Sequence, residues 1–431
     1  MPIRLNSADS DFEAAFVRLL GAKRESDADV GVVVAGIIDD VRSRGDAAVI
    51  EATRKFDRFE LSPETMRITT DEIAGARALC DPETIAALEL AATRITDFHR
   101  RQMPEDLDYT DDAGLRLGYR WSAVGAAGLY VPGGTAAYPS SVLMNALPAR
   151  VAGVERMVMV VPTPDGKLSP LVLVAAEIAG IDEIYRIGGA QAIAALAYGT
   201  ETIAAVDKIV GPGNAYVAAA KRQVFGAVGI DMIAGPSEIL VLAGADNDPA
   251  WIAADLLSQA EHDVAAQAIL ITDDAAFAEA VITAIDGHLK TLPRADIAGQ
   301  SWDDFGAVIT VPDLAAAVPL VDRIAPEHLE IATDNARDLA SQVRNAGAVF
   351  IGRFAPEALG DYLAGPNHVL PTSRSARFSS GLGVLDFLKR TSMIEADATA
   401  LGEVGPAVVT LAEAEGLGAH ALSVAIRLNR S

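Results

Sequence analysis

The sequence is poor in cysteine, aromatic residues and basic residues. Cys80 is the single cysteine among 431 residues, which excludes an intramolecular disulfide and any zinc or redox site of the CxxC type. Aromatic residues make up 5% of the chain, so few side chains are available to stack on bases or sugars. The 35 Lys and Arg stand against 59 Asp and Glu, a formal net charge of −24. This acidity disfavours nucleic acids and anionic membrane surfaces as partners.

Two kinds of apolar segment are missing as well. No stretch approaches the roughly 18 consecutive apolar residues that a membrane-spanning helix needs. The first residues, MPIRLNSADSDFE, lack the basic stretch and apolar core of a secretory signal. Since 51% of the residues are nonetheless hydrophobic, we expect a cytoplasmic globular protein of about two or three domains with a large core.

The sequence does contain a regular alternation of short apolar runs and helical patterns. Residues 1–110 have apolar positions three or four apart, which predicts helices. Residues 107–124 have short apolar runs and turn residues, which fit a hairpin or an irregular crossing. Beyond Gly125, two alternating series predict parallel sheets covered by helices on both faces. The predicted strands are 128–131, 156–161, 183–187 and 208–210 in the first series, and 238–243, 267–272, 306–310, 329–333 and 347–352 in the second. The segment after Pro371 is too short to fold alone, so we expect it to pack on its own chain or on a partner.

No GxGxxG motif follows a predicted strand, but four glycine-dense turns do, at 131–141, 187–200, 210–221 and 233–238. Glycine lets backbone N–H groups approach a phosphate, and the N-terminus of a following helix adds its dipole. A tight turn between strand and helix also needs glycine for its geometry alone, which explains any single one of them. Ligands of open α/β sheets bind beyond the carboxyl ends of the strands, so four such turns favour a nucleotide site without demonstrating it.

Some of the six histidines lie in patterns that suit a metal ion. Gln259 and His262 are three apart at the end of a predicted helix and share a face, which fits half of a zinc site or a solvated surface pair. Asp361 and His368 lie in a loop rich in Gly and Pro, where catalytic groups collect, although a capping Asp and a hydrogen-bonded His give the same pattern. His420 could be a further ligand only if the tail folds back or reaches a neighbouring chain.

Glu327 and His328 are adjacent, immediately before a predicted strand. In a turn both side chains can face one cleft, where the imidazole titrates near neutrality and the carboxylate can activate water. A surface Glu-His pair gives the same dipeptide. His99 and His288 lie in predicted helices beside charged residues, and we expect them on solvated faces.

Eight motifs occur together in one order: YVPGGTAAYPSSVLMNALPA, IGGAQAIAALAYGT, VGPGNAYVAAAK, DMIAGPSE, DLLSQAEHD, APEHLE, GDYLAGPNHVLPT and EGLGAH. In this order they resemble the histidinol dehydrogenase family, from about residue 30 to the end. The resemblance implies an enzyme that uses NAD and one zinc ion per subunit. It would oxidise L-histidinol through L-histidinal to L-histidine, the last step of histidine biosynthesis.

The resemblance also implies a role for each matching residue. The zinc ligands would be Gln259, His262, Asp361 and His420. His328 would act as the base and Glu327 would activate water. NAD would contact Tyr130, Gln191 and Asn214, and the substrate would contact Ser237, Gln259, His262, His328, Asp361, Glu415 and His420.

The fold that the resemblance implies is α/β: two incomplete Rossmann-like domains with parallel sheets, a helical N-terminal segment, and a C-terminal tail exchanged in a homodimer. The expected division is an N-terminal arm (1–24), a larger discontinuous domain with the metal and catalytic residues (25–110 and 238–372), an inserted NAD-binding domain (111–237), and a tail (373–431). In this scheme Glu415 and His420 of the tail complete the active site of the partner subunit.

Two other functions fit part of the pattern. A zinc hydrolase would use the same kind of ligands with a neighbouring Glu and would need no dinucleotide. A binding protein without activity could have kept the scaffold, but the presence of Glu327, His328 and all four ligand residues disfavours it. Oxidation through a cysteine thiohemiacetal is also disfavoured, because Cys80 lies in a helical stretch away from every glycine-rich turn. We therefore expect water as the nucleophile.

Overall fold

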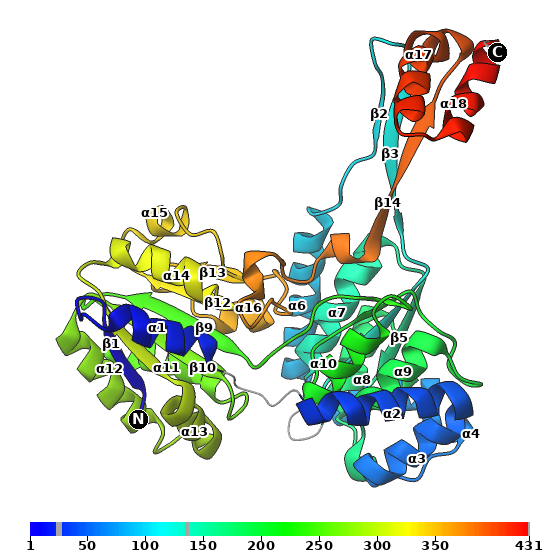
Figure 1. Ribbon diagram of the computed structural model, residues 1–431. Helices are drawn as coiled ribbons and strands as arrows, with labels where there is room; N and C mark the ends of the chain where they lie inside the picture. Colours follow the sequence, from blue (N-terminus) through cyan, green and yellow to red (C-terminus); the bar gives the residue numbers. More distant parts are fainter. Residues whose placement is uncertain (23–27, 134–137, 430–431) are drawn as a thin grey trace.

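The computed structural model describes residues 1–22, 28–133 and 138–429, and builds them into two parallel sheets and one antiparallel arm (Figure 1). Each parallel sheet has helices on both faces, as the alternating pattern predicts. Among the described helices, none combines the length and the apolar character required to cross a membrane.

The larger sheet has six parallel strands, and its central strand β9 is buried at every position, as expected of a strand covered on both faces. In spatial order its strands are β1 (Ile3–Asn6), β11 (Ala307–Thr310), β10 (Gln267–Thr272), β9 (Glu238–Ala243), β12 (His328–Ala332) and β13 (Ala348–Ile351). One face is covered by α1 (Phe12–Gly21), α14 (Val318–Ile324) and α15 (Ala336–Ala340). The other face is covered by α11 (Pro249–Ala260), α12 (Ala275–His288) and α13 (Ala295–Phe305), and the short α16 (Ala358–Tyr362) follows β13.

The smaller sheet has five parallel strands, with β4 at its centre. In spatial order they are β6 (Glu183–Tyr185), β5 (Arg156–Val160), β4 (Ala126–Tyr130), β7 (Lys208–Val210) and β8 (Gly229–Ile230). One face is covered by α5 (Thr70–Ala76), α6 (Pro82–Arg100), α7 (Pro139–Ala152) and α8 (Pro170–Ala179). The other is covered by α2 (Ala28–Arg44), α3 (Asp46–Asp57), α4 (Pro63–Met66), α9 (Gly189–Tyr198) and α10 (Ala215–Val224).

The predicted hairpin forms an arm that projects from the five-stranded unit (Figure 1). It consists of β2 (Leu107–Thr110) and β3 (Arg116–Ala123), joined by a turn in which Asp111 accepts hydrogen bonds from two backbone N–H groups. The tail adds β14 (Leu388–Glu395) as a third antiparallel strand along β3. Two packed helices, α17 (Ala398–Ala414) and α18 (Gly418–Ala425), form the outer end of the arm. The tail therefore packs partly on its own chain.

The packing differs from the expected division of the chain in two places. Residues 1–24 were expected to form a separate arm, but β1 pairs with β11 at the edge of the six-stranded sheet and Phe16 of α1 is fully buried beneath it. Helices α2 to α6 were assigned to the larger domain, but they pack on the five-stranded sheet. An amphipathic helix shows that one face is buried and does not show against which sheet.

His99 is a further correction, because it is fully buried in α6 and not solvated. Its Nδ1 lies 2.8 Å from the carbonyl oxygen of Ile95, one turn earlier in the helix. Burial lowers the pKa of His99, so the ring is neutral at neutral pH. The neighbouring charges in the sequence belong to the outer face of the helix and do not reach it.

Candidate active site

The carboxyl edge of the five-stranded sheet and the amino edge of the six-stranded sheet line one cleft of about 470 Å³. Tyr130 ends β4 and Asn214 follows β7, so the five-stranded sheet contributes its carboxyl edge. Glu327 and His328 lie at the start of β12, so the six-stranded sheet contributes its amino edge. Ser237, Gln259, His262 and Asp361 line the same cleft. A volume of this size is typical of sites for small molecules.

Glu327 and His328 are both held by the backbone of one residue, Glu238. The N–H of Glu238 donates to Glu327 Oε2 at 2.9 Å, and the carbonyl oxygen of Glu238 lies 2.9 Å from His328 Nδ1. A carbonyl only accepts, so this contact assigns the proton of the ring to Nδ1 and leaves the lone pair on Nε2. His328 Nε2 is buried without a hydrogen-bond partner in the described structure.

Burial sets the protonation of this pair. It raises the pKa of Glu327 well above the usual range of a glutamate, and the nearby carboxylates of Glu238, Asp361 and Glu357 raise it further. Burial lowers the pKa of His328, against the opposing charge of Glu357. The neutral imidazole of His328 can accept a proton at Nε2, and the raised pKa of Glu327 makes its carboxylate form a stronger base than that of a solvated glutamate.

Acidic groups collect beside His328. One ligand-type atom from each of His328, Glu357 and Asp361 lies within 4.8 Å of the others, and Glu357 Oε1 is 3.6 Å from His328 Nε2. Ser258 Oγ donates to the other oxygen of Glu357 at 3.0 Å. Burial, followed by the charge and hydrogen bond of Glu357, raises the pKa of Asp361 well above its usual range. These acids are close enough to repel one another unless a proton or a cation lies between them.

His368 supports Asp361 from the opposite side. Its Nδ1 lies 3.1 Å from the carbonyl oxygen of Asp361 and 3.6 Å from Asp361 Oδ1, and its Nε2 is 3.4 Å from Ser141 Oγ. Burial lowers the pKa of His368 to about 4, so the ring is neutral in the working range of most enzymes. The structure therefore brings Asp361 and His368 into contact, although Asp361 lies in the short helix α16 and not in the expected loop.

Three further acids belong to the site and were missed by the sequence analysis: Glu357, Glu330 and Asp255. Burial raises the pKa of Glu330 well above its usual range and that of Asp255 to about 6. A spacing signal exists for each of them. Glu357 precedes Asp361 by four residues, Asp255 precedes Gln259 by four in α11, and Glu330 follows His328 by two along β12. These spacings place each acid on the same helix face or strand face as a predicted site residue.

Unpartnered polar atoms indicate that the site fits a metal ion. Gln259 Nε2, His328 Nε2 and Glu357 Oε1 are buried without hydrogen-bond partners among the described residues. A flip of the Gln259 side-chain amide exchanges its oxygen and nitrogen without changing its shape. After this flip the unpartnered atom is an oxygen, which suits a metal ion. The side chain of His262 is exposed where it lines the cleft, but desolvation by the surrounding protein lowers its pKa, which favours the neutral ring that ligates metals.

The predicted NAD contacts lie at the carboxyl edge of the five-stranded sheet. The hydroxyl of Tyr130 accepts a hydrogen bond from Gly189 N at 3.1 Å, and burial raises the pKa of Tyr130 to about 12. Asn214 caps α10 by accepting from Tyr216 N at 3.1 Å and lines the cleft. Gln191 is buried in the first turn of α9, beneath the Gly189 turn, and does not line the cleft. The turn at 131–141 includes residues 134–137, which lie outside the described residues.

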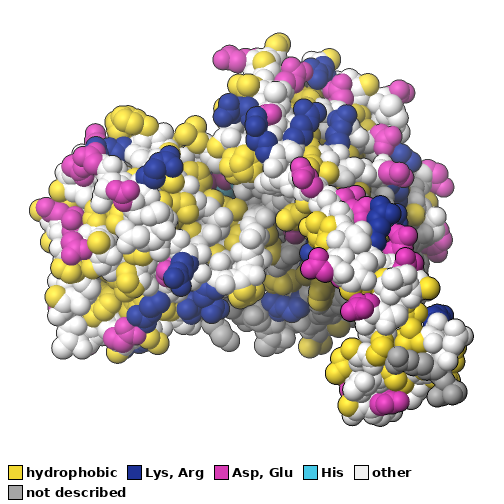
Figure 2. Space-filling view, turned by 90° about the horizontal axis from the view of Figure 1, so that it is seen from above, with side chains coloured by type: hydrophobic (Ala, Val, Ile, Leu, Met, Phe, Trp, Pro, Cys, Tyr) yellow, Lys and Arg dark blue, Asp and Glu magenta, His cyan; other side chains and the backbone are white. Residues whose placement is uncertain are grey.

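Glu415 and His420 lie away from the cleft in this chain. Both are exposed at the outer end of the arm, where α17 ends and α18 begins (Figure 1). Apolar side chains are exposed on the same end, including Leu411, Leu417, Leu422 and Ile426, and Figure 2 shows hydrophobic side chains gathered there. A single chain therefore brings together three of the four predicted metal ligands and leaves the fourth distant.

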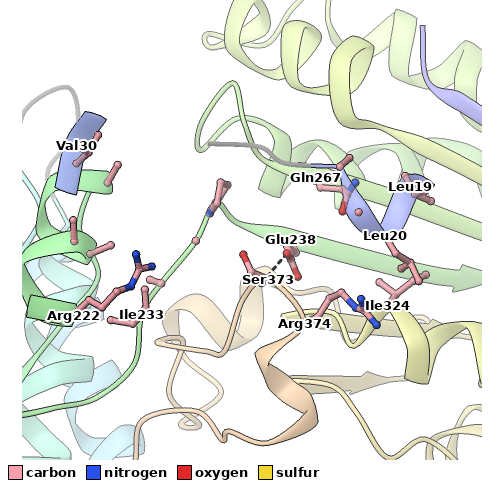
Figure 3. A pocket seen from close by; sticks show the side chains of 18 of the residues that line it. Leu19, Leu20, Val30, Arg222, Ile233, Glu238, Gln267, Ile324, Ser373 and Arg374 are labelled. Atoms are coloured by element: carbon pink, nitrogen blue, oxygen red, sulfur yellow. Dashed lines mark hydrogen bonds between the residues drawn. The ribbon is translucent and has the colours of Figure 1, made fainter. Parts of the chain in front are cut away.

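A second cavity, of about 420 Å³, adjoins the cleft along the linker of residues 234–236 (Figure 3). It is lined mainly by apolar side chains of both units, with Arg222 and Arg374 among them. The side chain of Glu238 lines this cavity and accepts a hydrogen bond from Ser373 N at 2.9 Å. Glu238 thus holds Glu327 and His328 with its backbone, while its side chain connects the tail to the sheet.

Comparisons with known proteins show which family this chain is similar to. The family model described as histidinol dehydrogenase matches residues 21–428. Histidinol dehydrogenase from Ruegeria pomeroyi is 66% identical over 430 residues, covering 100% of this chain and 99% of the relative. The one from Rhodospirillum rubrum is 65% identical over 431 residues, with the same coverage. The crystal structure of histidinol dehydrogenase from Elizabethkingia anophelis is 35% identical, with a TM-score of 0.94 over 99% of this chain and 98% of that one.

Proposed function

This chain belongs to the histidinol dehydrogenase family, and from that premise we propose that the cleft between the two sheets oxidises L-histidinol through L-histidinal to L-histidine with NAD. The protein is an oxidoreductase, and the reaction is the last step of histidine biosynthesis. The observation that supports this use of the cleft is the meeting of a buried Glu-His pair with metal-ligand side chains, opposite the glycine turns of the other sheet.

His328 is the base for both oxidations in this proposal. Its Nε2 has no hydrogen-bond partner among the described residues and lies 3.6 Å from Glu357 Oε1, so a proton taken from the substrate hydroxyl is stabilised by a nearby carboxylate. The bond from Nδ1 to the carbonyl oxygen of Glu238 keeps the ring in the tautomer that can accept that proton.

Glu327 serves the second oxidation. An aldehyde has no hydrogen ready to leave as hydride together with a hydroxyl proton until water has added to it. Glu327 lines the cleft beside His328 and its raised pKa makes it a stronger base than a solvated glutamate, so we assign it the deprotonation of that water. Cys80 does not line the cleft; it directly follows η1 (Arg77–Leu79), and its half-buried thiol donates to the carbonyl oxygen of Ala76 at 3.4 Å.

The residues that would hold zinc are Gln259, His262 and Asp361 of one chain with His420 of the partner subunit. Zinc prefers such nitrogen and oxygen ligands. When bound, the ion would fix the substrate through its nitrogen atoms and neutralise the repulsion among the buried acids. Glu357 lies between Asp361 and His328 and would orient both without itself belonging to the proposed ligand set.

We further propose a homodimer that exchanges its arms. His420 and Glu415 are exposed on an arm that reaches away from its own cleft, and that end of the arm carries unburied apolar side chains. Exposed aromatic residues also occur on the six-stranded unit: Tyr362 lines the cleft, and Trp251 and Phe354, which do not line it, pack with ring centroids 5.9 Å apart. Apolar surface at both places is what a shared interface would bury.

Because histidine biosynthesis draws on cytoplasmic metabolites, we also propose a cytoplasmic location.

The test of this function is the number of NADH molecules formed per L-histidinol. With excess NAD and limiting histidinol, the zinc-loaded protein should form about two NADH per histidinol, because two hydrides leave one carbon. No NADH with this substrate would refute the proposal and favour a zinc hydrolase. A protein loaded with zinc that binds histidinol and NAD without turnover would instead be a binding protein.

A further inference from the structure

Lys221 and Asp231 form an ion pair inside the five-stranded unit, well apart from the acidic site. Their side chains are only 2% and 1% exposed. Lys221 comes from the second half of α10, and Asp231 directly follows β8. Placing two charges in a protein interior is costly unless further hydrogen bonds satisfy them. The hydrogen bonds of this pair therefore indicate what it does.

Both partners bind the backbone of the same residue, Gly211. The N–H of Gly211 donates to Asp231 Oδ2 at 2.8 Å, and the ammonium of Lys221 donates to the carbonyl oxygen of Gly211 at 3.1 Å. Gly211 has a φ of +112°, and a Cβ placed on it would lie 2.1 Å from the carbonyl oxygen of Tyr130. Glycine can adopt many backbone conformations, so the two charge-assisted hydrogen bonds stabilise this one conformation of Gly211 over the others.

Gly211 begins the turn that faces the cleft. Pro212, Gly213 and Asn214 follow it and all line the cleft, and the side chain of Asn214 caps the N-terminus of α10. Lys221 lies farther along this helix and reaches back to the start of the turn. The ion pair thus joins the helix, the turn and the end of β8 into one unit at the edge where a dinucleotide is proposed to bind.

We propose that Lys221 and Asp231 are positioning residues for the dinucleotide: they hold the Gly211–Asn214 turn in the shape that receives NAD. This inference rests on the proposed NAD site at the carboxyl edge of the five-stranded sheet. A pair that only strengthened the fold would affect stability and leave the affinity for NAD unchanged.

A matched control exists in the same sheet. Arg156 and Glu183 form a partly buried ion pair with bonds of 2.8 and 2.9 Å at the starts of β5 and β6, which is the edge opposite the cleft. Glu183→Gln weakens an ion pair of the same unit without touching any glycine turn of the cleft. The test variants are Lys221→Met and the double variant Lys221→Met/Asp231→Leu. The double variant leaves neither charge of the pair unpaired in the interior, so it keeps the test decisive if the single variant fails to fold.

The experiment titrates NAD into the zinc-loaded proteins by calorimetry and measures KM for NAD and for histidinol. We expect the dissociation constant and KM for NAD to rise at least about tenfold in both test variants, the effect of losing charge-assisted bonds to a binding turn. KM for histidinol and the zinc content should stay near those of the parent protein, and Glu183→Gln should keep the parent affinity for NAD.

The outcomes separate this inference from the proposed function. If the parent protein does not bind NAD, the proposed function is refuted and the inference falls with it. If the parent binds NAD and the double variant binds it equally well, only the inference is overturned. It is also overturned if Glu183→Gln loses affinity for NAD as strongly as the test variants, because the effect would then come from general loss of stability.

Discussion

The substitution Glu327→Gln separates the two oxidations in the proposed mechanism. Glutamine has the shape of glutamate, and its amide oxygen can accept the same bond from Glu238 N that holds Glu327 at 2.9 Å. The substitution therefore keeps the side chain in place and removes its ability to take a proton. A positioned general base contributes about 10²- to 10⁴-fold, so the oxidation of histidinal should slow by that factor. Oxidation of histidinol, which needs no water, should change by less than about tenfold.

The assay follows NADH from limiting histidinol and, separately, from histidinal. The parent protein should form about two NADH per histidinol, whereas Glu327→Gln should form one quickly and release an aldehyde that semicarbazide traps. His328→Ala is the control, since loss of the base should slow both oxidations. Equal rates with histidinal for Glu327→Gln and the parent would refute the assignment of water activation to Glu327.

The stability of Glu327→Gln gives an independent check with a defined sign. Burial raises the pKa of Glu327 in the folded protein, so its contribution to stability is fully present below the unfolded pKa and is lost as pH rises toward the folded value. Glutamine carries no such dependence. In metal-free protein at pH 8, the melting temperature of Glu327→Gln should equal or exceed that of the parent. A clear decrease would mean that the carboxylate is stabilised by groups other than those described.

Three further predictions concern the shared site, the buried acids and the glycine turn. Mixing His420→Ala chains with His262→Ala chains should recover about one quarter of the parental activity. Half of the dimers are then mixed, and each mixed dimer has one intact site out of two. No recovery in verified mixed dimers would exclude a site shared between subunits. Zinc added to metal-free protein should release protons, since burial raises the pKa of Asp255 to about 6 and that of Asp361 well above its usual range. The number of protons released should decrease as pH rises. An indicator dye that reports no proton release at pH 6 would contradict this. Gly211→Ala should lower the melting temperature more than Gly153→Ala does. Both glycines have positive φ, but only at Gly211 would an added Cβ collide with backbone atoms, those of Tyr130. Equal melting temperatures of the two variants would contradict this steric explanation.

The sequence predicted the central strands well because each is a short apolar run buried on both faces, as in β4, β5, β9 and β10. It missed β1, whose four residues are mostly exposed, and β8, which has two residues. Such strands exist only because a neighbouring strand offers hydrogen bonds to them. The packing of α2 to α6 could not be predicted either, since the helical pattern does not name the sheet it covers.

The candidate site was predictable where motifs were long and the chemistry distinctive. Gln259, His262, Glu327, His328 and Asp361 line one cleft although their segments are far apart in the sequence. Glu330, Glu357 and Asp255 were missed because their spacing from the predicted site residues also fits exposed surface acids, and the sequence alone does not show that these acids are buried. Their burial comes from the meeting of α11, β12 and the start of α16, which is a property of the tertiary structure.

The central claim is that one zinc ion is held by Gln259, His262 and Asp361 of one chain and by His420 of the partner subunit. Anomalous diffraction at the zinc edge from crystals of the zinc-loaded protein with L-histidinol tests it directly. We expect one strong peak per chain within bonding distance of these four side chains. Each peak should have ligands from both chains of the dimer. A peak bound only by residues of a single chain, or lying away from Asp361, would contradict it.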